Sequence, residues 1–131
     1  MLEQTVEKKY KILIVDDEEM LNNMYEFKFQ QEWFDVEVAK DWIEAYASIH
    51  GFQPDIVLLD IMMPNMDWFE TLKLFKQEPF LNSKVIVLSN LSDPKYIQLA
   101  RDMWADDFIV KANSKPQDIV DRVKILLTVR N

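Results

Sequence analysis

The run Lys11-Ile12-Leu13-Ile14-Val15-Asp16-Asp17 is typical of an α/β protein, because it is an apolar strand that ends in two carboxylates. A second run, Asp55-Ile56-Val57-Leu58-Leu59-Asp60, repeats this pattern. The carboxyl ends of parallel strands meet at one edge of an α/β sheet, where ligands bind. We therefore expect Asp16, Asp17 and Asp60 to gather at that edge, and charge gathered in this way needs a cation.

Five short runs rich in Val, Ile and Leu predict the strands of one sheet: 11–16, 35–39, 55–60, 84–89 and 107–110. These runs are mostly continuous rather than alternating, as expected when helices cover both faces of the sheet. Helix-like segments alternate with them, which favours a doubly wound, five-stranded parallel sheet of the flavodoxin-like α/β class. We expect one domain over 11–129, preceded by a polar tail over 1–10.

Apolar residues at helical spacing mark the segments between the strands. The first, fourth and fifth helices are predicted from Met20, Met24 and Phe27, from Tyr96, Leu99, Ala100 and Met103, and from Ile119, Val123, Leu126 and Leu127. Helix starts are predicted from the N-cap candidates Asp17, Asp41, Asp93 and Ser114.

Composition narrows the function further. The 131 residues are 49% apolar, carry a net charge of −8 and contain no cysteine, so a disulfide framework and a thiolate metal site are both excluded. The start, Met1 to Lys11, lacks a signal-peptide apolar region, and no apolar run approaches the roughly 20 residues that cross a bilayer. We expect a cytoplasmic protein that binds neither membranes nor nucleic acid directly, because both partners are polyanionic.

Two further polar residues end predicted strands, Ser89 and Lys111. A pair of carboxylates about 5 Å apart repels by roughly 3 kcal/mol at an effective dielectric of 20, and Lys111 alone cannot balance three of them. Mg²⁺ can, and it prefers one or two carboxylates, water and phosphate oxygens. The missing ligand is then a phosphoryl group.

Asp60 is the best candidate for a carboxylate nucleophile, because it follows the most apolar strand and precedes the turn Ile61-Met62-Met63-Pro64. Phosphoryl transfer needs positioning and charge neutralisation, which Lys111 and Mg²⁺ supply, while the Ser89 hydroxyl can donate a hydrogen bond to a phosphoryl oxygen. Alone, an Asp-Asp pair after a strand is usually a helix cap, and a lysine there is usually solvated; their occurrence together in order favours a site.

Four motifs together resemble the receiver domain of bacterial two-component response regulators: residues 11–17, Leu58 to Pro64, Val87-Leu88-Ser89 and Asp107 to Lys111. The resemblance implies a receiver domain over 11–129 and a sensor histidine kinase, or a phosphotransfer protein, that phosphorylates Asp60 from a phosphohistidine. It also implies that Asp16, Asp17, Asp60 and the backbone carbonyl of Met62 organise Mg²⁺.

The resemblance further implies a switch, in which Ser89 moves toward the phosphoryl oxygens and Phe108 rotates inward, so that the face of the fourth helix, fifth strand and fifth helix changes shape. The alternative is that Phe108 simply fills the core beside Trp104. A downstream protein target is implied, with a phosphorylation-dependent homodimer left open. Ala112 stands where the family usually has proline after the lysine, so the local loop geometry stays open.

All four tryptophans occupy places where the family typically has glycine: Trp33, Trp42, Trp68 and Trp104, which leaves Gly51 as the single glycine. Glycine at such places commonly serves a left-handed backbone that costs other residues roughly 1–2 kcal/mol each. We hypothesise that the gene comes from a lineage that reads UGA as glycine and that it was translated here with UGA as tryptophan. Four UGG codons in the gene would contradict this hypothesis. The alternative is that the four side chains are natural surface or interface anchors.

The leading interpretation is a stand-alone receiver that signals by protein contact, with no enzyme activity beyond its own phosphorylation and dephosphorylation. Two alternatives stay open: a pseudo-receiver that is never phosphorylated, and a fragment of a longer transcriptional regulator. An α/β phosphohydrolase is disfavoured because Met62 stands where that class places a second acid, and a flavodoxin-like cofactor site because Asp17-Glu18-Glu19 would repel a phosphate. The single histidine, His50, lies away from the strand ends and is not expected to donate a phosphoryl group.

Overall fold

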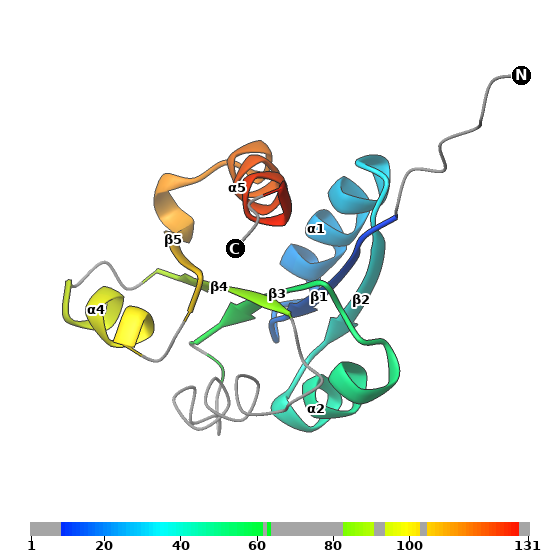
Figure 1. Cartoon of the computed structure of the whole chain (residues 1–131), viewed down its shortest axis with the longest axis horizontal. Coiled ribbons are helices and arrows are strands. Elements are labelled where there is room, and N and C mark those ends of the chain that lie inside the picture. Colours follow the sequence, from blue (N-terminus) through cyan, green and yellow to red (C-terminus); the bar gives the residue numbers. More distant parts are fainter. Residues whose placement is uncertain (1–8, 62, 64–82, 91–93, 103–104, 129–131) are drawn as a thin grey trace, which may run out of the picture.

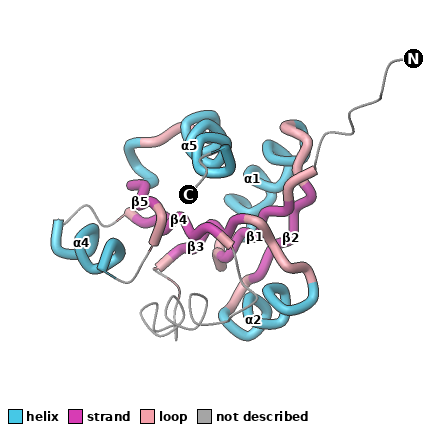
Figure 2. The backbone as a smooth tube through the Cα atoms, in the orientation of Figure 1, coloured by secondary structure: helices cyan, strands magenta, loops and turns pink. Residues whose placement is uncertain are grey.

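The computed structural model describes residues 9–61, 63, 83–90, 94–102 and 105–128. Within these ranges five parallel strands form one sheet in the order β2-β1-β3-β4-β5 (Figures 1 and 2). The strands are β1 Lys11–Val15, β2 Asp35–Ala39, β3 Ile56–Asp60, β4 Lys84–Ser89 and β5 Asp107–Val110. The predicted sheet is confirmed; β1 ends one residue earlier than predicted and β3 begins one residue later.

Helices cover both faces of this sheet. They are α1 Glu19–Gln31, α2 Trp42–Gly51, α4 Pro94–Asp102 and α5 Pro116–Thr128, with a short 3₁₀ helix, η1 Lys111–Asn113, after β5. Figure 1 shows α1 and α5 together on one face and α2 on the other. The segment between β3 and β4 falls mostly outside the described residues. Within the ranges described, no helix has the length and the apolar character that crossing a bilayer requires.

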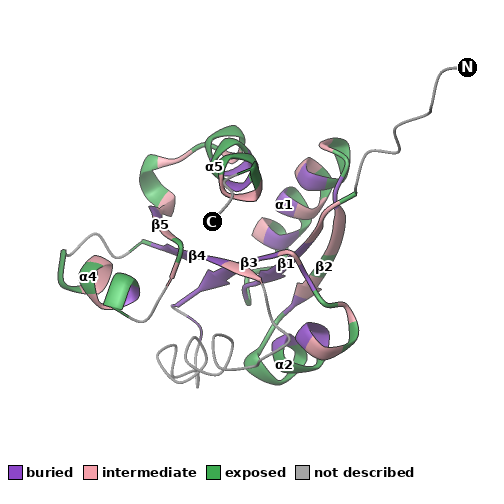
Figure 3. Ribbon diagram, viewed as in Figure 1, coloured by how far each residue is buried: buried purple, intermediate pink, exposed green. Residues whose placement is uncertain are grey.

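Alternate strand residues feed two separate cores. Ile12 and Ile14 of β1 pack in one cluster with residues of α1 and α5, whereas Leu13 and Val15 pack in a second cluster with residues of α2. All four side chains are 0–1% exposed. In Figure 3 the strands β1, β3 and β4 are mostly buried, whereas the edge strands β2 and β5 are mostly of intermediate burial. Burying such a side chain is worth about 1.5–3 kcal/mol, so both faces must be covered, as the continuous apolar runs predict.

The prediction of which face of the first helix is buried is wrong. Met20, Met24 and Phe27 are 87%, 41% and 64% exposed, and the buried face of α1 instead carries Asn22, Tyr25 and Phe29. Both sets fit a helical repeat, and the buried set contains a polar residue and a tyrosine, so ranking the faces by hydrophobicity selects the outer one. The fifth helix is oriented as predicted, because its residues Ile119 and Val123 are fully buried.

Helix starts agree with the prediction at α2 and differ at α1. The Asp41 carboxylate caps α2 by accepting a hydrogen bond from the Glu44 N–H at 2.8 Å. At α1 the N-cap residue is Glu18, not Asp17, and its side chain makes no capping bond. The Glu18 N–H donates instead to Oδ1 of Asp16 at 2.9 Å. Asp16 therefore stabilises the turn that precedes α1 and does not cap the helix.

The start of α5 also differs from the prediction. Ser114 follows η1 as its C-cap residue, and α5 begins at Pro116. The Lys115 N–H donates to the Asp118 carboxylate at 2.8 Å, so an acid inside the first turn satisfies the helix start. The remaining predicted cap, Asp93, lies outside the described residues.

The end of α1 has a left-handed residue at Trp33, whose φ is 70°. The Trp33 N–H donates to the Gln30 carbonyl at 3.1 Å and the Phe34 N–H to the Phe29 carbonyl at 3.0 Å. These two bonds form a Schellman motif, in which glycine is the usual left-handed residue. The Phe29 and Phe34 rings meet edge to face at 5.3 Å and complete it. The predicted glycine-like backbone is thus present at Trp33.

The same expectation is wrong for Trp42. This residue is the first of α2 and is absent from the described non-glycine residues with positive φ, which are Trp33 and Gln53. A tryptophan in the first turn of a helix carries no left-handed strain. Trp68 and Trp104 lie outside the described residues.

Candidate functional site

The structure brings the three predicted carboxylates together at one edge of the sheet. Asp16 directly follows β1, and Asp60 is the last residue of β3, which neighbours β1 in parallel register. Asp16, Asp17 and Asp60 each offer one carboxylate oxygen, and these oxygens lie within 4.8 Å of one another. A single ion of small radius can contact all three.

Burial differs among the three acids and gives the cluster a direction. Asp16 is 2% exposed and Asp60 is 3% exposed, whereas Asp17 is exposed. Asp17 therefore forms the open side of the site, through which a cation and a phosphoryl donor can arrive. Asp60, the proposed nucleophile, has its carboxylate inside the edge rather than in bulk water.

Lys111 bridges the two buried acids. It is the first residue after β5, and its ammonium Nζ donates to Oδ2 of Asp16 at 2.7 Å and to Oδ2 of Asp60 at 3.2 Å. Its side chain is 10% exposed. Burial by itself would lower the pKa of Lys111, but the hydrogen bonds to and charges of Asp16 and Asp60 outweigh it and raise that pKa. The lysine thus stays charged beside Asp60.

One ammonium does not neutralise three carboxylates, so the cluster retains an excess of negative charge. The donor set is all oxygen, with two buried acids and one exposed acid, which fits Mg²⁺ and excludes a soft-metal site. The predicted fourth ligand, the backbone carbonyl of Met62, lies outside the described residues. The Asp16, Asp17 and Asp60 side chains fit a hard divalent cation whose remaining positions are open to water and phosphate.

The loop that carries Asp16 is held by hydrogen bonds that the sequence analysis missed. The Asp16 N–H donates to the Ala39 carbonyl at 3.0 Å, and the Asn22 side-chain amide donates to the Asp16 carbonyl at 2.6 Å. Asn22 is 3% exposed. The sequence gives no clear sign of this role for Asn22. The hydrophobic pattern of α1 places this polar residue on the outer face, whereas the structure places it on the inner face.

Tyr25 follows Asn22 on this inner face, and the charges of the site change the pKa of its phenol. Burial raises the pKa of the Tyr25 phenol, the Lys111 charge partly opposes this, and the charges of Asp16 and Asp60 add to it. Tyr25 is 4% exposed. The buried side of α1 thus lies close enough to the acidic cluster for electrostatic interaction.

The two predicted switch residues lie near the same edge. Ser89 is the last residue of β4, is fully buried and pairs in register with Val110, the residue before Lys111. Phe108 of β5 is partly buried and packs against Ile61, Val87 and Ala100, so one edge of its cluster comes from the residue after Asp60. Its predicted neighbour Trp104 lies outside the described residues.

The loop after Lys111 adopts η1, with Ala112 in its middle. The sequence analysis left this geometry open, because Ala112 stands at the position where a proline is usual. It turns the chain from β5 toward α5 while Lys111, its first residue, reaches back to the acids.

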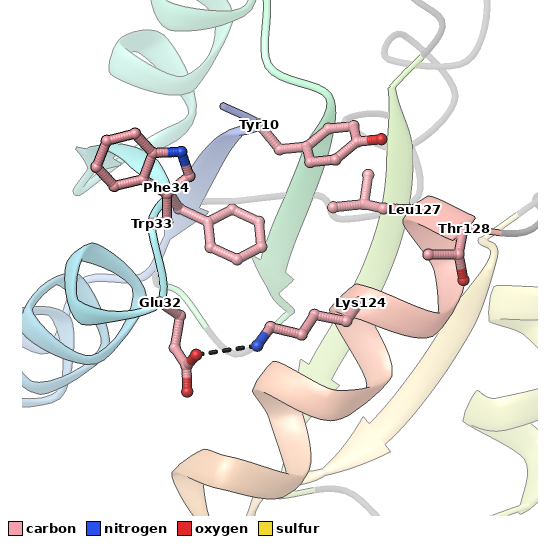
Figure 4. Close-up of a pocket in the computed structure, with 7 residues that line it drawn as sticks. All are labelled: Tyr10, Glu32, Trp33, Phe34, Lys124, Leu127 and Thr128. Carbon is pink, nitrogen blue, oxygen red and sulfur yellow. Dashed lines mark hydrogen bonds and ion pairs between the residues drawn. The ribbon is translucent and has the colours of Figure 1, made fainter. Parts of the chain in front are cut away.

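A separate hollow of about 550 Å³ lies at the opposite edge of the sheet. It is lined by residues before β1 and β2 and by the end of α5: Tyr10, Glu32, Trp33, Phe34, Lys124, Leu127 and Thr128. Figure 4 shows its rings and Leu127, together with the ion pair between Lys124 and Glu32, 2.9 Å long. This hollow does not border the acidic cluster and contributes nothing to its chemistry.

Comparison with known proteins gives a consistent family. Residues 12–124 match the family model of the response regulator receiver domain. The chain is 31% identical over 118 residues to the alkaline phosphatase synthesis transcriptional regulatory protein PhoP of Bacillus subtilis (strain 168), covering 89% of this chain and 48% of PhoP. It is 30% identical over 119 residues to the DNA-binding response regulator MtrA of Mycobacterium tuberculosis (strain ATCC 25618 / H37Rv), covering 91% of this chain and 51% of MtrA. The chain thus spans about half the length of these curated relatives.

Solved structures agree with the sequence matches. The Francisella response regulator 1452 receiver domain superposes with a TM-score of 0.82 at 29% identity, covering 90% of this chain and 96% of that one. The BeF3-activated DrrB receiver domain gives a TM-score of 0.82 at 25% identity, covering 93% of this chain and 100% of that one. With the five-stranded parallel sheet, the acidic edge and the family match together, the chain belongs to the response regulator receiver domains of two-component signal transduction.

Proposed function

We propose that this chain is a phosphoacceptor whose Asp60 takes a phosphoryl group from the phosphohistidine of a sensor histidine kinase or a phosphotransfer protein. The observation that carries the proposal is the buried Asp60 carboxylate, 3.2 Å from the Lys111 ammonium and within 4.8 Å of the Asp16 and Asp17 oxygens. Asp16, Asp17, Asp60 and the carbonyl of Met62 would hold Mg²⁺.

The chemistry is a displacement at phosphorus. A carboxylate oxygen of Asp60 forms a bond to phosphorus and the phosphorus–nitrogen bond of the donor breaks. The histidine leaves as neutral imidazole, because its other ring nitrogen takes up a proton from solvent. Lys111 already lies against Asp60 and can follow the transferred group with its three N–H donors. Bound Mg²⁺ supplies charge neutralisation for the phosphoryl oxygens. The protein thus contributes positioning and charge, and no enzyme activity beyond its own phosphorylation and dephosphorylation is proposed.

Signalling follows from a two-state change at the far side of the site. We propose that Ser89 moves toward the phosphoryl oxygens and that Phe108 then turns into the space vacated, which alters the face formed by α4, β5 and α5. Phe108 packs against Ile61, Val87 and Ala100, and Ile61 directly follows the nucleophile. A shift at Asp60 therefore has a short packed route to β5.

The altered face is proposed to bind a downstream protein or to form a homodimer, and the chain is proposed to act in the cytoplasm. PhoP and MtrA are named as a transcriptional regulatory protein and a DNA-binding response regulator, and the present chain matches about half of each. With a net charge of −8, this domain is not expected to contact nucleic acid directly. Any effect on DNA would pass through another domain or protein.

The proposal is tested by incubating the protein with acetyl phosphate and Mg²⁺ and measuring its intact mass. We expect one phosphoryl adduct that is labile to acid and base, as an acyl phosphate is. This adduct should not form when EDTA is present from the start. Asp60→Asn should give no adduct. The matched control is Asp121→Asn, which removes an exposed acid from α5 and should be phosphorylated normally.

Two results would contradict the assignment. An adduct that survives in Asp60→Asn would place the modification elsewhere. A wild-type protein that binds Mg²⁺ and yet gains no phosphoryl group from acetyl phosphate or from a kinase would support a pseudo-receiver.

A further inference from the structure

A buried asparagine of α1 is hydrogen-bonded to the backbone of Asp16, one of the three clustered acids. Asn22 lies on the inner face of α1, is 3% exposed, and donates its side-chain N–H to the backbone carbonyl of Asp16 at 2.6 Å. The bond spans the turn between β1 and α1, so it fixes the position of the residue that follows β1. This contact lies outside the set of ligands and the nucleophile proposed above.

Every polar group of Asp16 is engaged. Its N–H donates to Ala39, its carbonyl accepts from Asn22, its Oδ1 accepts from the Glu18 N–H and its Oδ2 accepts from Lys111. The carboxylate therefore points where these bonds direct it. Since Asn22 sets the carbonyl end of the residue, it helps to set the carboxylate end as well.

The other end of the Asn22 side chain has no such partner. Its Oδ1 is buried and accepts no hydrogen bond from any residue that the structure describes. A buried carbonyl oxygen without a donor is destabilising and rare in native proteins. The next residues along the same inner face, Tyr25 and Phe29, pack in the apolar cluster, where a leucine at position 22 would leave no oxygen unpaired.

The inner face of α1 lies close to the site at this level. Tyr25, one turn beyond Asn22, is near enough to Lys111, Asp16 and Asp60 for their charges to act on its phenol.

We propose that Asn22 is a positioning residue for the metal ligand Asp16, because its side-chain amide fixes the Asp16 backbone at the turn after β1. The inference rests on the proposed function, because it assigns Asn22 a role toward the same divalent cation. It adds a residue of α1 to a site otherwise built from strand ends. Groups that orient metal ligands in this way typically change metal affinity by about 10-fold to 100-fold when removed.

The test uses Asn22→Leu, which keeps the side-chain size and removes both polar atoms. Divalent binding is measured directly on the unphosphorylated protein, with Mn²⁺ followed by electron paramagnetic resonance and Mg²⁺ by competition. We expect affinity to fall about 10-fold to 100-fold. The urea midpoint of the metal-free protein should stay close to wild type, because the variant loses the donor to Asp16 and loses the unpaired Oδ1 together. Asn22→Ala repeats both measurements without any added bulk.

Ser48 provides a matched control on another helix. It is 6% exposed in α2, and its hydroxyl donates to the Glu37 carboxylate, away from the acidic cluster. Ser48→Ala should lower the urea midpoint, because a part-buried hydrogen bond is lost, and should leave Mn²⁺ affinity unchanged. The pair of variants therefore separates loss of stability from loss of metal binding.

Three outcomes overturn the inference. Wild-type metal affinity in both Asn22 variants would show that the residue does not position Asp16. A lower urea midpoint with unchanged affinity would make Asn22 a structural residue of the helix. If wild-type protein itself binds no divalent cation, the proposed function fails first, and the inference fails with it.

Discussion

A single ammonium group, that of Lys111, holds two buried carboxylates in the metal-free protein. Removing one partner of a buried ion pair leaves an uncompensated charge and typically costs about 3–5 kcal/mol. We expect Lys111→Met to lower the free energy of unfolding by about 3 kcal/mol, because Asp16 and Asp60 each lose the hydrogen bond from this ammonium. Urea unfolding with and without Mg²⁺ checks this, and Mg²⁺ should restore part of the loss.

The control for Lys111 is a surface lysine. Lys124 pairs with Glu32 at 2.9 Å, but its side chain is 48% exposed. Exposed pairs contribute about 0–1 kcal/mol, so Lys124→Met should unfold at nearly the wild-type urea concentration. Equal losses in the two variants would contradict the buried bridge.

Trp33 carries a second residue-level prediction. A left-handed backbone costs a non-glycine residue about 1–2 kcal/mol, while glycine adds about 0.5–1 kcal/mol of unfolded-chain entropy. We expect Trp33→Gly to raise the free energy of unfolding by about 0.5–1 kcal/mol, measured by urea titration. Part of any shortfall would reflect the lost contact between the Trp33 ring and the Lys9 ammonium, which lies 4.7 Å from the ring centre.

The matching controls have opposite expected signs. Gln53 also has a positive φ, 53°, so Gln53→Gly should stabilise. Trp42 lies in the first turn of α2, so Trp42→Gly should lower stability by about 0.5 kcal/mol through reduced helix propensity. Stabilisation by Trp42→Gly, or destabilisation by Trp33→Gly, would contradict the backbone assignment. The origin of the four tryptophans stays a prediction that the codons of the gene decide.

At the scale of elements, α1 links the acceptor site to the molecular surface. It begins at Glu19, just after Asp17, and shows Met20 and Met24 on its outer face. A protein donor that reaches Asp60 must cover the surroundings of the site, and exposed apolar side chains there favour contact. We expect Met20→Gln with Met24→Gln to slow phosphotransfer from a cognate kinase while leaving phosphorylation by acetyl phosphate unchanged.

The control for this prediction lies at the other end of the molecule. Ile125 is 58% exposed near the end of α5, whose carboxyl end borders the hollow opposite the acidic cluster. Ile125→Gln should change neither rate. A loss of the acetyl phosphate reaction in the double variant would instead indicate damage to the site.

Elements differ in how far the sequence predicts them. The strands are predicted almost to the residue, most clearly β1, β3 and β4, which are buried on both faces and therefore have continuous apolar runs. The buried face of α1 is not predicted, because it carries the polar Asn22, whereas the apolar Met20, Met24 and Phe27 lie on the exposed side. The N-cap of α1 is also missed, because Asp17 and Glu18 are both acidic and only the backbone geometry shows that the helix begins after Glu18. Asn22 itself has no signal without the fold.

For the whole molecule, the pH dependence of the free energy of unfolding depends on charged groups at the site. The raised pKa of Lys111 stabilises the fold fully below the unfolded value, about 10.4, and this stabilisation is lost as pH rises through the folded value. The raised pKa of Tyr25 acts in the same direction, because the phenol ionises first in the unfolded chain. Metal-free protein should therefore lose stability above about pH 10.

Urea titrations between about pH 8 and pH 11 measure this loss. Tyr25→Phe should reduce the slope, and Lys111→Met should reduce it as well, each from its own starting stability. A slope that is unchanged in both variants would assign the alkaline transition to other groups.

The bond from Lys111 to Asp16 joins residues 95 positions apart. A ribosome that has made β1 and β3 has supplied all three carboxylates, while β5 and the lysine are still to come. During synthesis the nascent chain therefore carries an acidic edge without its counter-charge, and the acceptor site is completed only when the last strand is added.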